Sequence, residues 1–261
     1  ISTYAGQILS YRPVSQNSDM LFLSEAAYFR DGKAIKGGSP VCWPWFGADP
    51  ENKGRAAHGF VRNRQWRVTD TQTLDDGSTR IVLAIDSNDE ILAIWPHAFE
   101  LSIQFTLGTS LEISLATTNR DSQPVEITQA LHTYFKVGDI SKTQLLGLEG
   151  KSYIDTLDNN QTKTQQGLVE FVAETDRIYT DIDSDIILND PVLERNIKIA
   201  STGSKSAVVW NPWVEKSASM DDFLDEEYKI MLCVETTNAG PDTVDLASGD
   251  TYVLKARYTV S

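Results

Sequence analysis

The sequence predicts an all-β protein, a large antiparallel β-sandwich with few short helices. Short runs of apolar and β-branched residues recur from end to end, with turn signals between them. No stretch keeps a helical apolar spacing over three turns. The chain has 261 residues, 41% of them hydrophobic, which is enough for a sizeable core. Because no repeat, low-complexity tract or linker interrupts it, we expect a single domain over residues 1–261.

The clearest predicted element is a hairpin. Residues 100–107 and 111–116 alternate polar and apolar side chains, and Gly108 marks the turn between them. Such alternation places one face of each strand in the core and the other in water. One short helix is expected over residues 220–224, with Ser219 as its N-cap. Further strands are expected at residues 20–23, 66–69, 80–85, 125–128, 143–148, 192–199, 206–210, 229–236 and 251–260.

Residues 34–67 stand apart from this pattern. Their many Gly and Pro residues exclude a continuous helix or central strand, so we expect an ordered loop rich in aromatic residues. The whole chain has a formal net charge of −14, yet residues 30–67 hold eight Lys or Arg against three acidic residues. This concentration predicts a compact anion site. The candidate phosphate ligands are Lys36 and Arg62, and more weakly Arg55 and Arg64, although any one of them could be a solvated surface charge.

Composition also excludes several classes of protein. A strong negative charge argues against binding to nucleic acid or to an anionic membrane. No apolar run reaches about 18 residues, and the first residues lack the layout of a signal peptide. Cys42 and Cys233 have no CxxC spacing, so neither a zinc site nor a redox pair is indicated. We therefore expect a cytoplasmic protein with reduced thiols, and a monomer by default.

Two residues are candidates for acid–base chemistry. His132 follows the strand pattern of residues 125–131, and histidine is the side chain best suited to proton transfer near neutral pH. Alternatively, it is a satisfied polar residue beside aromatic neighbours. Glu235 lies in the apolar run 230–236, where it is either exposed at the end of a strand or partly buried with a raised pKa. The acidic run 221–227 lacks the spacing of an EF-hand and is interpreted as a solvated face.

Six motifs resemble, in order, the glucose-6-phosphate 1-epimerase (hexose-6-phosphate mutarotase) branch of the aldose 1-epimerase family. They are AIKGGSPVCWPWFG, AHGFVRNRQW, LHTYFKVGDI, ETDRIY, WNPWVEK and CVET. The resemblance covers most of the chain and implies the galactose-mutarotase-like supersandwich. It also implies interconversion of the α and β anomers of a hexose 6-phosphate, with D-glucose 6-phosphate as the first candidate. The family reaction needs no cofactor and no metal.

The resemblance also implies roles for particular residues. In the family, the histidine at the position of His132 protonates the sugar ring oxygen, and the glutamate at the position of Glu235 takes the proton from the anomeric hydroxyl. The resemblance makes Asp176 an acceptor for sugar hydroxyls and His58 a residue that positions the substrate. Without the family, Asp176 could equally pair with Arg177 or cap a turn.

Lys36 and Arg62 form the expected anion clamp, and this pair contains the clearest departure from the family. Arg62 matches, but Lys36 stands where the family usually has Arg, so the charge is kept while the bidentate fork is lost. Ala57 stands where some relatives have a substrate-contacting Gln. Two alternatives therefore stay open: an aldose 1-epimerase for unphosphorylated sugars, and a non-catalytic protein that binds a sugar or a sugar phosphate.

Other candidates receive no direct role in binding. His97 fits a family segment but is expected to be structural, beneath the site. Lys216 falls in a matching segment without an assignment. Tryptophan can stack on sugar rings, but it is more often a core or loop-anchoring residue. We therefore assign no direct sugar contact to any of the four candidates: Trp43, Trp45, Trp210 and Trp213.

Overall fold

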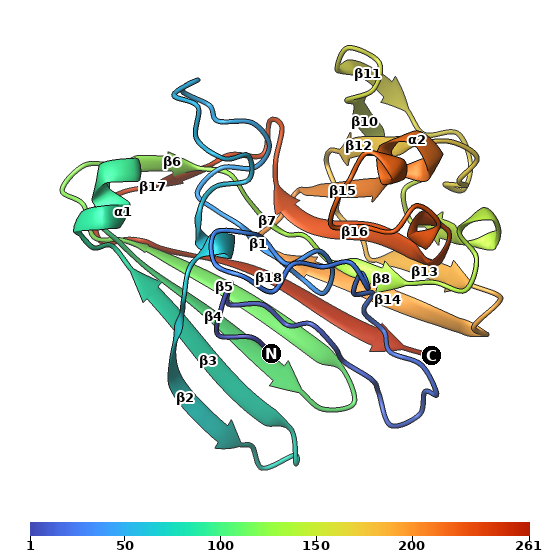
Figure 1. Cartoon of the computed structure of the whole chain (residues 1–261), viewed down its shortest axis with the longest axis horizontal. Helices are drawn as coiled ribbons and strands as arrows, with labels where there is room; N and C mark the ends of the chain where they lie inside the picture. The colour runs from blue at the N-terminus through green and yellow to red at the C-terminus, as the bar shows by residue number, and fades with distance from the viewer.

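The computed structural model describes residues 1–261, and its regular secondary structure is mostly antiparallel β-strand (Figure 1). Two eight-stranded sheets share one hydrophobic core of 52 buried residues, and a small two-stranded sheet lies beside them. The all-β prediction is therefore confirmed.

Apart from the two-residue β1, the first sheet is formed by strands from the middle and the end of the chain. Its central strand β16 is buried along its whole length. In spatial order, the strands are β1 (Val41–Cys42), β7 (Gln129–Leu131), β16 (Met231–Asn238), β15 (Ser206–Asn211), β12 (Thr175–Tyr179), β10 (Ser152–Asp155) and β11 (Gln161–Thr164), and β8 (Tyr134–Lys136) also pairs with β16.

The second sheet contains the longest strands. Its β4 and β5 form the predicted hairpin, with strict alternation of buried and less buried side chains along the first eight residues of β4 and all of β5. In spatial order, the strands are β2 (Arg67–Thr73), β3 (Thr79–Asp86), β4 (Phe99–Leu107), β5 (Leu111–Asn119), β18 (Thr251–Val260), β14 (Arg195–Thr202), β13 (Ile186–Asp190) and β9 (Gln144–Leu146).

Helical structure is scarce. The two α-helices are α1 (Asp89–Ile94) and α2 (Trp213–Ala218), and the small sheet pairs β17 (Val244–Leu246) with β6 (Val125–Ile127). Single 3-10 turns occur at Val61–Asn63, Ile140–Lys142 and Glu227–Ile230. None of these helices has the length and the apolar composition that a membrane crossing requires.

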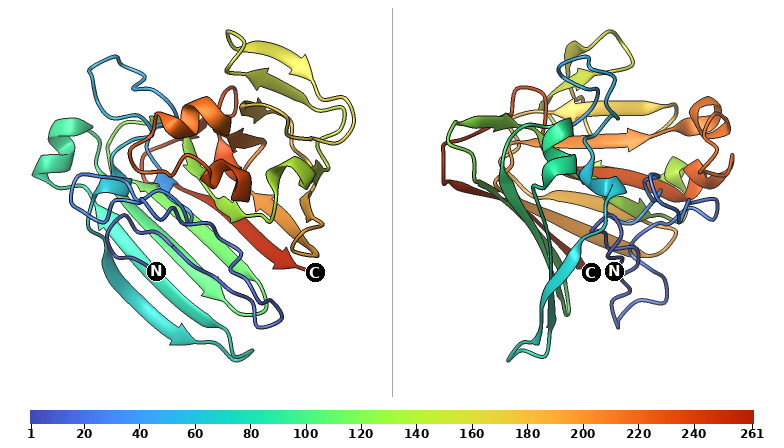
Figure 2. Two further views of the ribbon diagram at one scale, coloured as in Figure 1. Left: turned by 45° about the vertical axis from the view of Figure 1, so that its right-hand side comes forward. Right: turned by 60° about the vertical axis from the view of Figure 1, so that its left-hand side comes forward.

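The N-terminal segment runs alongside the second sheet before the chain enters it (Figures 1 and 2). Isolated bridges tie this segment to the loop that follows, for instance between Ile8 and Ser39. Most of residues 34–66 is irregular, as predicted, apart from the two residues of β1 and one 3-10 turn. This long loop is ordered because its aromatic side chains, Trp43 and Trp45 among them, are buried in the core.

The helix predicted over residues 220–224 is wrong. Ser219 follows the C-terminus of α2, and its N–H and hydroxyl both donate to the carbonyl of Lys216. The following residues form a turn, because the buried carboxylate of Glu227 accepts the N–H of Leu224 together with the N–H of Glu25. The acidic run is therefore not a uniformly solvated face, since Glu227 is a buried organiser of the loop.

Two strand predictions also need correction. Residues 20–23 make only isolated bridges at Leu21 and Leu23, to different neighbours. Residues 192–194 belong to a turn, in which Asp190 accepts the N–H of Val192, so β14 starts only at residue 195. Pro191 just after β13 explains the break, because proline has no N–H to donate to a ladder.

Candidate active site

A cavity of about 570 Å³ opens over one face of the first sheet. We call it the main cavity. The loop 34–66, the strands β12, β15 and β16, and the segment between β7 and β8 all contribute to its wall. The six site residues that the sequence suggested all line it: Lys36, His58, Arg62, His132, Asp176 and Glu235.

Strand register explains how residues far apart in sequence reach this face. Asp176 of β12 pairs with Trp210 of β15, and Trp210 pairs with Cys233 of β16. Two residues along, Val208 pairs with Glu235. Because side chains two residues apart in a strand point to the same face, Cys233 and Glu235 project together on the side that carries Asp176 and Trp210.

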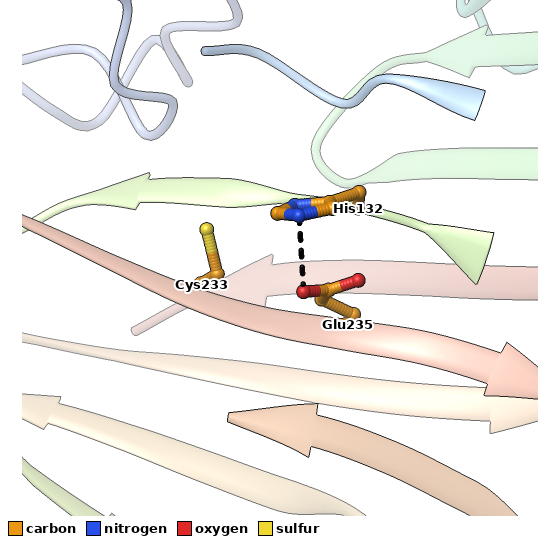
Figure 3. Close-up of side chains that lie close together, drawn as sticks. All are labelled: His132, Cys233 and Glu235. Carbon is orange, nitrogen blue, oxygen red and sulfur yellow. Dashed lines mark ion pairs between the residues drawn. The ribbon is translucent and has the colours of Figure 1, made fainter. Parts of the chain in front are cut away.

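The acid–base candidates face each other. His132 lies between β7 and β8, where its N–H donates to the carbonyl of Pro40 at 2.9 Å. Its Nε2 is 3.4 Å from Oε1 of Glu235, as Figure 3 shows. The ring also stacks on Tyr134, with centroids 4.9 Å apart and planes 12° from parallel. The orientation of the imidazole is therefore fixed from two sides.

Burial controls the protonation of this pair. Glu235 is 1% exposed, and desolvation raises the pKa of its carboxyl well above the usual value, an effect that nearby Asp176 strengthens. His132 is 9% exposed, and desolvation lowers the pKa of its imidazole. Both shifts disfavour a lone charge, so the pair is most stable when it carries no net charge and keeps one transferable proton.

His58 presents a hydrogen-bond donor to the cavity. Its Nδ1 accepts the N–H of Gly47 at 3.3 Å, so in the neutral ring the proton is on Nε2. Burial, together with Arg62 and Lys36, lowers the pKa of His58 to about 3, which keeps the ring neutral. Its backbone φ of +62° is rare for a residue other than glycine. Such backbone strain is typical of functional sites.

Lys36 and Arg62 are the two members of the basic segment that reach the main cavity. Arg62 donates from Nη2 to the carbonyl of Ala57, while its buried Nε has no partner. The Lys36 ammonium is 3.5 Å from the carboxylate of Asp222 and 3.7 Å from the sulfur of Met220. Burial lowers the pKa of Lys36, and Asp222 opposes this effect. Lys36 and Arg62 also line a second cavity of about 280 Å³.

The weaker phosphate candidates, Arg55 and Arg64, form ion pairs with other residues. Arg55 donates to Asp49 and Glu51 and stacks over the ring of Trp45, so it stabilises the loop. Arg64 pairs with Glu90 at 3.3 Å, outside the main cavity. The basic segment is therefore not one compact anion site, because most of its charges are neutralised locally.

Asp176 lies in the wall of the main cavity, and burial raises the pKa of its carboxyl. It forms no ion pair with Arg177, whose guanidinium contacts Gln165 and the ring of Tyr153 instead. His97 lies outside the cavity and contacts Asp121 at 3.3 Å.

Sequence reasoning left several cavity residues without a role. Trp210 and Lys216 line the cavity, whereas Trp43 and Trp45 are core residues and Trp213 packs on a tyrosine. Residues 206–210 are predicted as a strand, but no local pattern places Trp210 beside Asp176, because that pairing joins β15 to β12. The sequence also contains no signal that places three further lining residues in the cavity: Thr156, Asn160 and Met220.

One group of side chains has the composition of a metal site. The ligand atoms of His132, Cys233 and Glu235 lie within 4.8 Å of one another, and all three residues are buried (Figure 3). Cys42, the other cysteine, is buried and free, as is Cys233.

The supersandwich fold and a cavity with facing histidine and glutamate define a mutarotase-like protein. The chain belongs to the aldose 1-epimerase family, whose model matches residues 1–259. The resemblance read from the motifs is thereby confirmed.

Curated relatives place the chain within that family. A protein from Cenchrus ciliaris is 38% identical over 244 residues, which cover 90% of this chain and 73% of that one. An Escherichia coli K12 protein is 37% identical over 233 residues, covering 89% and 76%. Both carry the provisional name glucose-6-phosphate 1-epimerase.

Solved structures agree with this placement. A Salmonella typhimurium protein, provisionally described as a mutarotase, superposes with a TM-score of 0.92 at 31% identity over 99% of this chain and 85% of its own. A galactose mutarotase-like protein from Lactobacillus casei has a TM-score of 0.78 at 14% identity, over 100% of this chain and 96% of its own, and supports the fold alone.

Proposed function

We propose that the protein is an isomerase that interconverts the α and β anomers of a hexose 6-phosphate, with D-glucose 6-phosphate as the first candidate. The observation that carries the proposal is the facing pair of His132 and Glu235, 3.4 Å apart, in the cavity that Lys36 and Arg62 also line. The family and the names of the curated relatives support the same activity.

The chemistry requires two proton transfers. Opening a cyclic hemiacetal removes the proton of the anomeric hydroxyl and adds a proton to the ring oxygen. After rotation about the C1–C2 bond, the ring closes on the other face and the two roles reverse. In the proposal, Glu235 takes the anomeric proton and His132 protonates the ring oxygen.

The pair suits this cycle because one proton can reside on either partner. Burial of both side chains removes the net charge from the unliganded pair, so the same proton is available for the forward and the reverse direction. Asp176 accepts hydrogen bonds from sugar hydroxyls, and the Nε2–H of His58 donates one. These contacts would hold the pyranose between the two groups.

Lys36 and Arg62 bind the phosphate in this proposal. The buried Nε of Arg62 lacks a partner and offers a charge-assisted hydrogen bond to an anion. Lys36 supplies a point charge in place of the arginine fork.

One observation favours a second candidate. The carboxylate of Asp222 is already 3.5 Å from the Lys36 ammonium, so a phosphate must compete with it. An aldose 1-epimerase for unphosphorylated sugars would have no such competition.

Proton exchange spectroscopy by NMR tests the proposal. The sugar is equilibrated in buffer without inorganic phosphate, and the exchange rate between the two anomeric protons is measured as protein is added. We expect acceleration in proportion to protein concentration, and a larger kcat/KM for glucose 6-phosphate than for glucose. A larger kcat/KM for glucose would favour the second candidate, and binding of either sugar without acceleration would indicate a non-catalytic binding protein.

The proposal also covers the cellular compartment and the oligomeric state. We propose that the protein acts in the cytoplasm as a monomer. Two free thiols, Cys42 and Cys233, fit a reducing compartment.

A further inference from the structure

Three buried side chains beside the main cavity combine a thiol, an imidazole and a carboxylate. His132 and Glu235 line the cavity, and the fully buried Cys233 lies next to them without lining it. Cys233 and Glu235 project from the same face of β16, and His132 faces them from the segment before β8 (Figure 3). Their ligand atoms lie within 4.8 Å of one another. The proposed reaction uses His132 and Glu235 but gives no role to the thiol.

The spacing is close to that of a tetrahedral metal site. Zinc bonds of about 2.0–2.3 Å hold neighbouring ligand atoms about 3.3–3.8 Å apart. The 3.4 Å between Nε2 of His132 and Oε1 of Glu235 already falls in this range. The sulfur would have to approach by at most about 1 Å to complete three ligands, which rotation of a thiol side chain can supply.

A second observation independently indicates a ligand. Oε2 of Glu235 and Nδ1 of His132 are buried and have no hydrogen-bond partner. Buried polar atoms in proteins are normally satisfied, and an unpaired carboxylate oxygen costs free energy until something binds it. Oε2 is therefore available for a cation or for a substrate hydroxyl.

Charge balance favours a divalent cation. A thiolate, a carboxylate and a neutral imidazole together carry two negative charges, which one divalent ion neutralises. Lys36 and Arg62 line the same cavity and disfavour excess positive charge, whereas Asp176 opposes them. Mixed sulfur, nitrogen and oxygen ligands suit zinc and cadmium and fit magnesium or calcium poorly.

We propose that His132, Cys233 and Glu235 form a site for a thiophilic divalent cation such as Zn²⁺, and that the bound ion inhibits the enzyme. The ion occupies the two groups that the proposed mechanism needs for proton transfer, so metal and sugar exclude each other. The inhibitory part rests on the proposed function, whereas binding of the metal does not.

Cadmium titration tests the site directly, because a thiolate bound to Cd²⁺ absorbs in the ultraviolet by charge transfer. Reduced protein is titrated without phosphate or chelator. We expect one equivalent of Cd²⁺ to produce the band in the wild type and in Cys42→Ala, which is the matched control because that cysteine is equally buried. Cys233→Ala should lose the band. His132→Gln should weaken Cd²⁺ binding at least about tenfold, since it removes one of three ligands.

Two results would overturn the site: a band that survives in Cys233→Ala, or wild-type Cd²⁺ affinity in His132→Gln. If Cys233→Ala fails to fold, the His132→Gln titration still decides.

The inhibitory part needs an activity measurement with free Zn²⁺ held by a metal buffer. Zinc should stop anomer exchange in the wild type and in Cys42→Ala but not in folded Cys233→Ala. Equal zinc sensitivity of Cys233→Ala would refute the inhibition. An inactive wild-type protein that still shows the band would refute the proposed function and leave the metal site standing.

Discussion

The imidazole of His132 and the carboxyl of Glu235 lie 3.4 Å apart, although Glu235 belongs to β16 and His132 to the segment between β7 and β8. Each is buried, and each pKa is shifted in the direction that removes its charge. A pair of this kind is costly for a fold and useful for chemistry, because it holds a proton ready for transfer in either direction.

Replacing Glu235 with Gln should remove catalysis and keep the cavity shape. We expect anomer exchange on glucose 6-phosphate to fall about 10²–10⁴-fold, the usual range for a lost acid–base group. The measurement is NMR exchange at saturating sugar, with the fold checked by circular dichroism. Near-normal exchange in Glu235→Gln would remove this residue from the mechanism.

The same variant should change how stability depends on pH. Because the folded-state pKa of Glu235 is raised, the folded protein holds this proton more tightly than the unfolded chain does. The contribution of Glu235 to stability should therefore be fully present below the unfolded pKa and be lost as pH rises through the folded pKa. Glu235→Gln should remove a slope of up to about 1.4 kcal/mol per pH unit. Urea unfolding at pH 5 and pH 8 checks this, and a constant difference between the two proteins would contradict it.

The sequence was informative wherever local pattern and local structure agree. The alternation in residues 100–107 and 111–116 predicted β4 and β5 because one face of each strand is in the core. The motifs led to six residues that the fold gathers in one cavity, although their roles remain proposals.

What local pattern could not supply is long-range pairing. The charges near residue 36 look alike in sequence, but Asp49 binds Arg55 and Glu90 binds Arg64, and only the fold decides which cations stay available. The failed helix at residues 220–224 has the same origin, because the buried carboxylate of Glu227 determines that turn.

Lys36 tests the phosphate clamp. Lys36→Met should raise KM for glucose 6-phosphate at least about tenfold and change KM for glucose much less, because a partly buried charge partner of the phosphate is lost. Lys36→Arg should recover much of the affinity through its fork. Arg64→Met is the matched control, since Arg64 pairs with Glu90 outside the cavity. Equal losses for both sugars in Lys36→Met would show that Lys36 does not recognise the phosphate.

His58 should make the fold sensitive to acid. Its folded-state pKa of about 3 is below the ordinary value of 6.5, so its contribution to stability is present above pH 6.5 and is lost as pH falls toward 3. His58→Asn, a residue type that tolerates a positive φ, should flatten the decline in unfolding free energy between pH 6.5 and 4. The decline should not vanish, because His132 is shifted in the same direction. Parallel curves for the two proteins would exclude His58 as a source of the acid sensitivity.

Gly59, next to His58, should be intolerant of any side chain. Its φ is +72°, and a Cβ at this position would lie 1.8 Å from the carbonyl oxygen of Trp43, a backbone atom that cannot move aside. We expect Gly59→Ala to lower the unfolding free energy by more than about 3 kcal/mol. Gly54→Ala shares the positive φ but meets open space, so it should cost only about 1–2 kcal/mol. Urea unfolding of the two variants separates the effect of close packing from that of backbone strain. Equal losses of unfolding free energy in Gly59→Ala and Gly54→Ala would show that the contact with Trp43 does not limit residue 59.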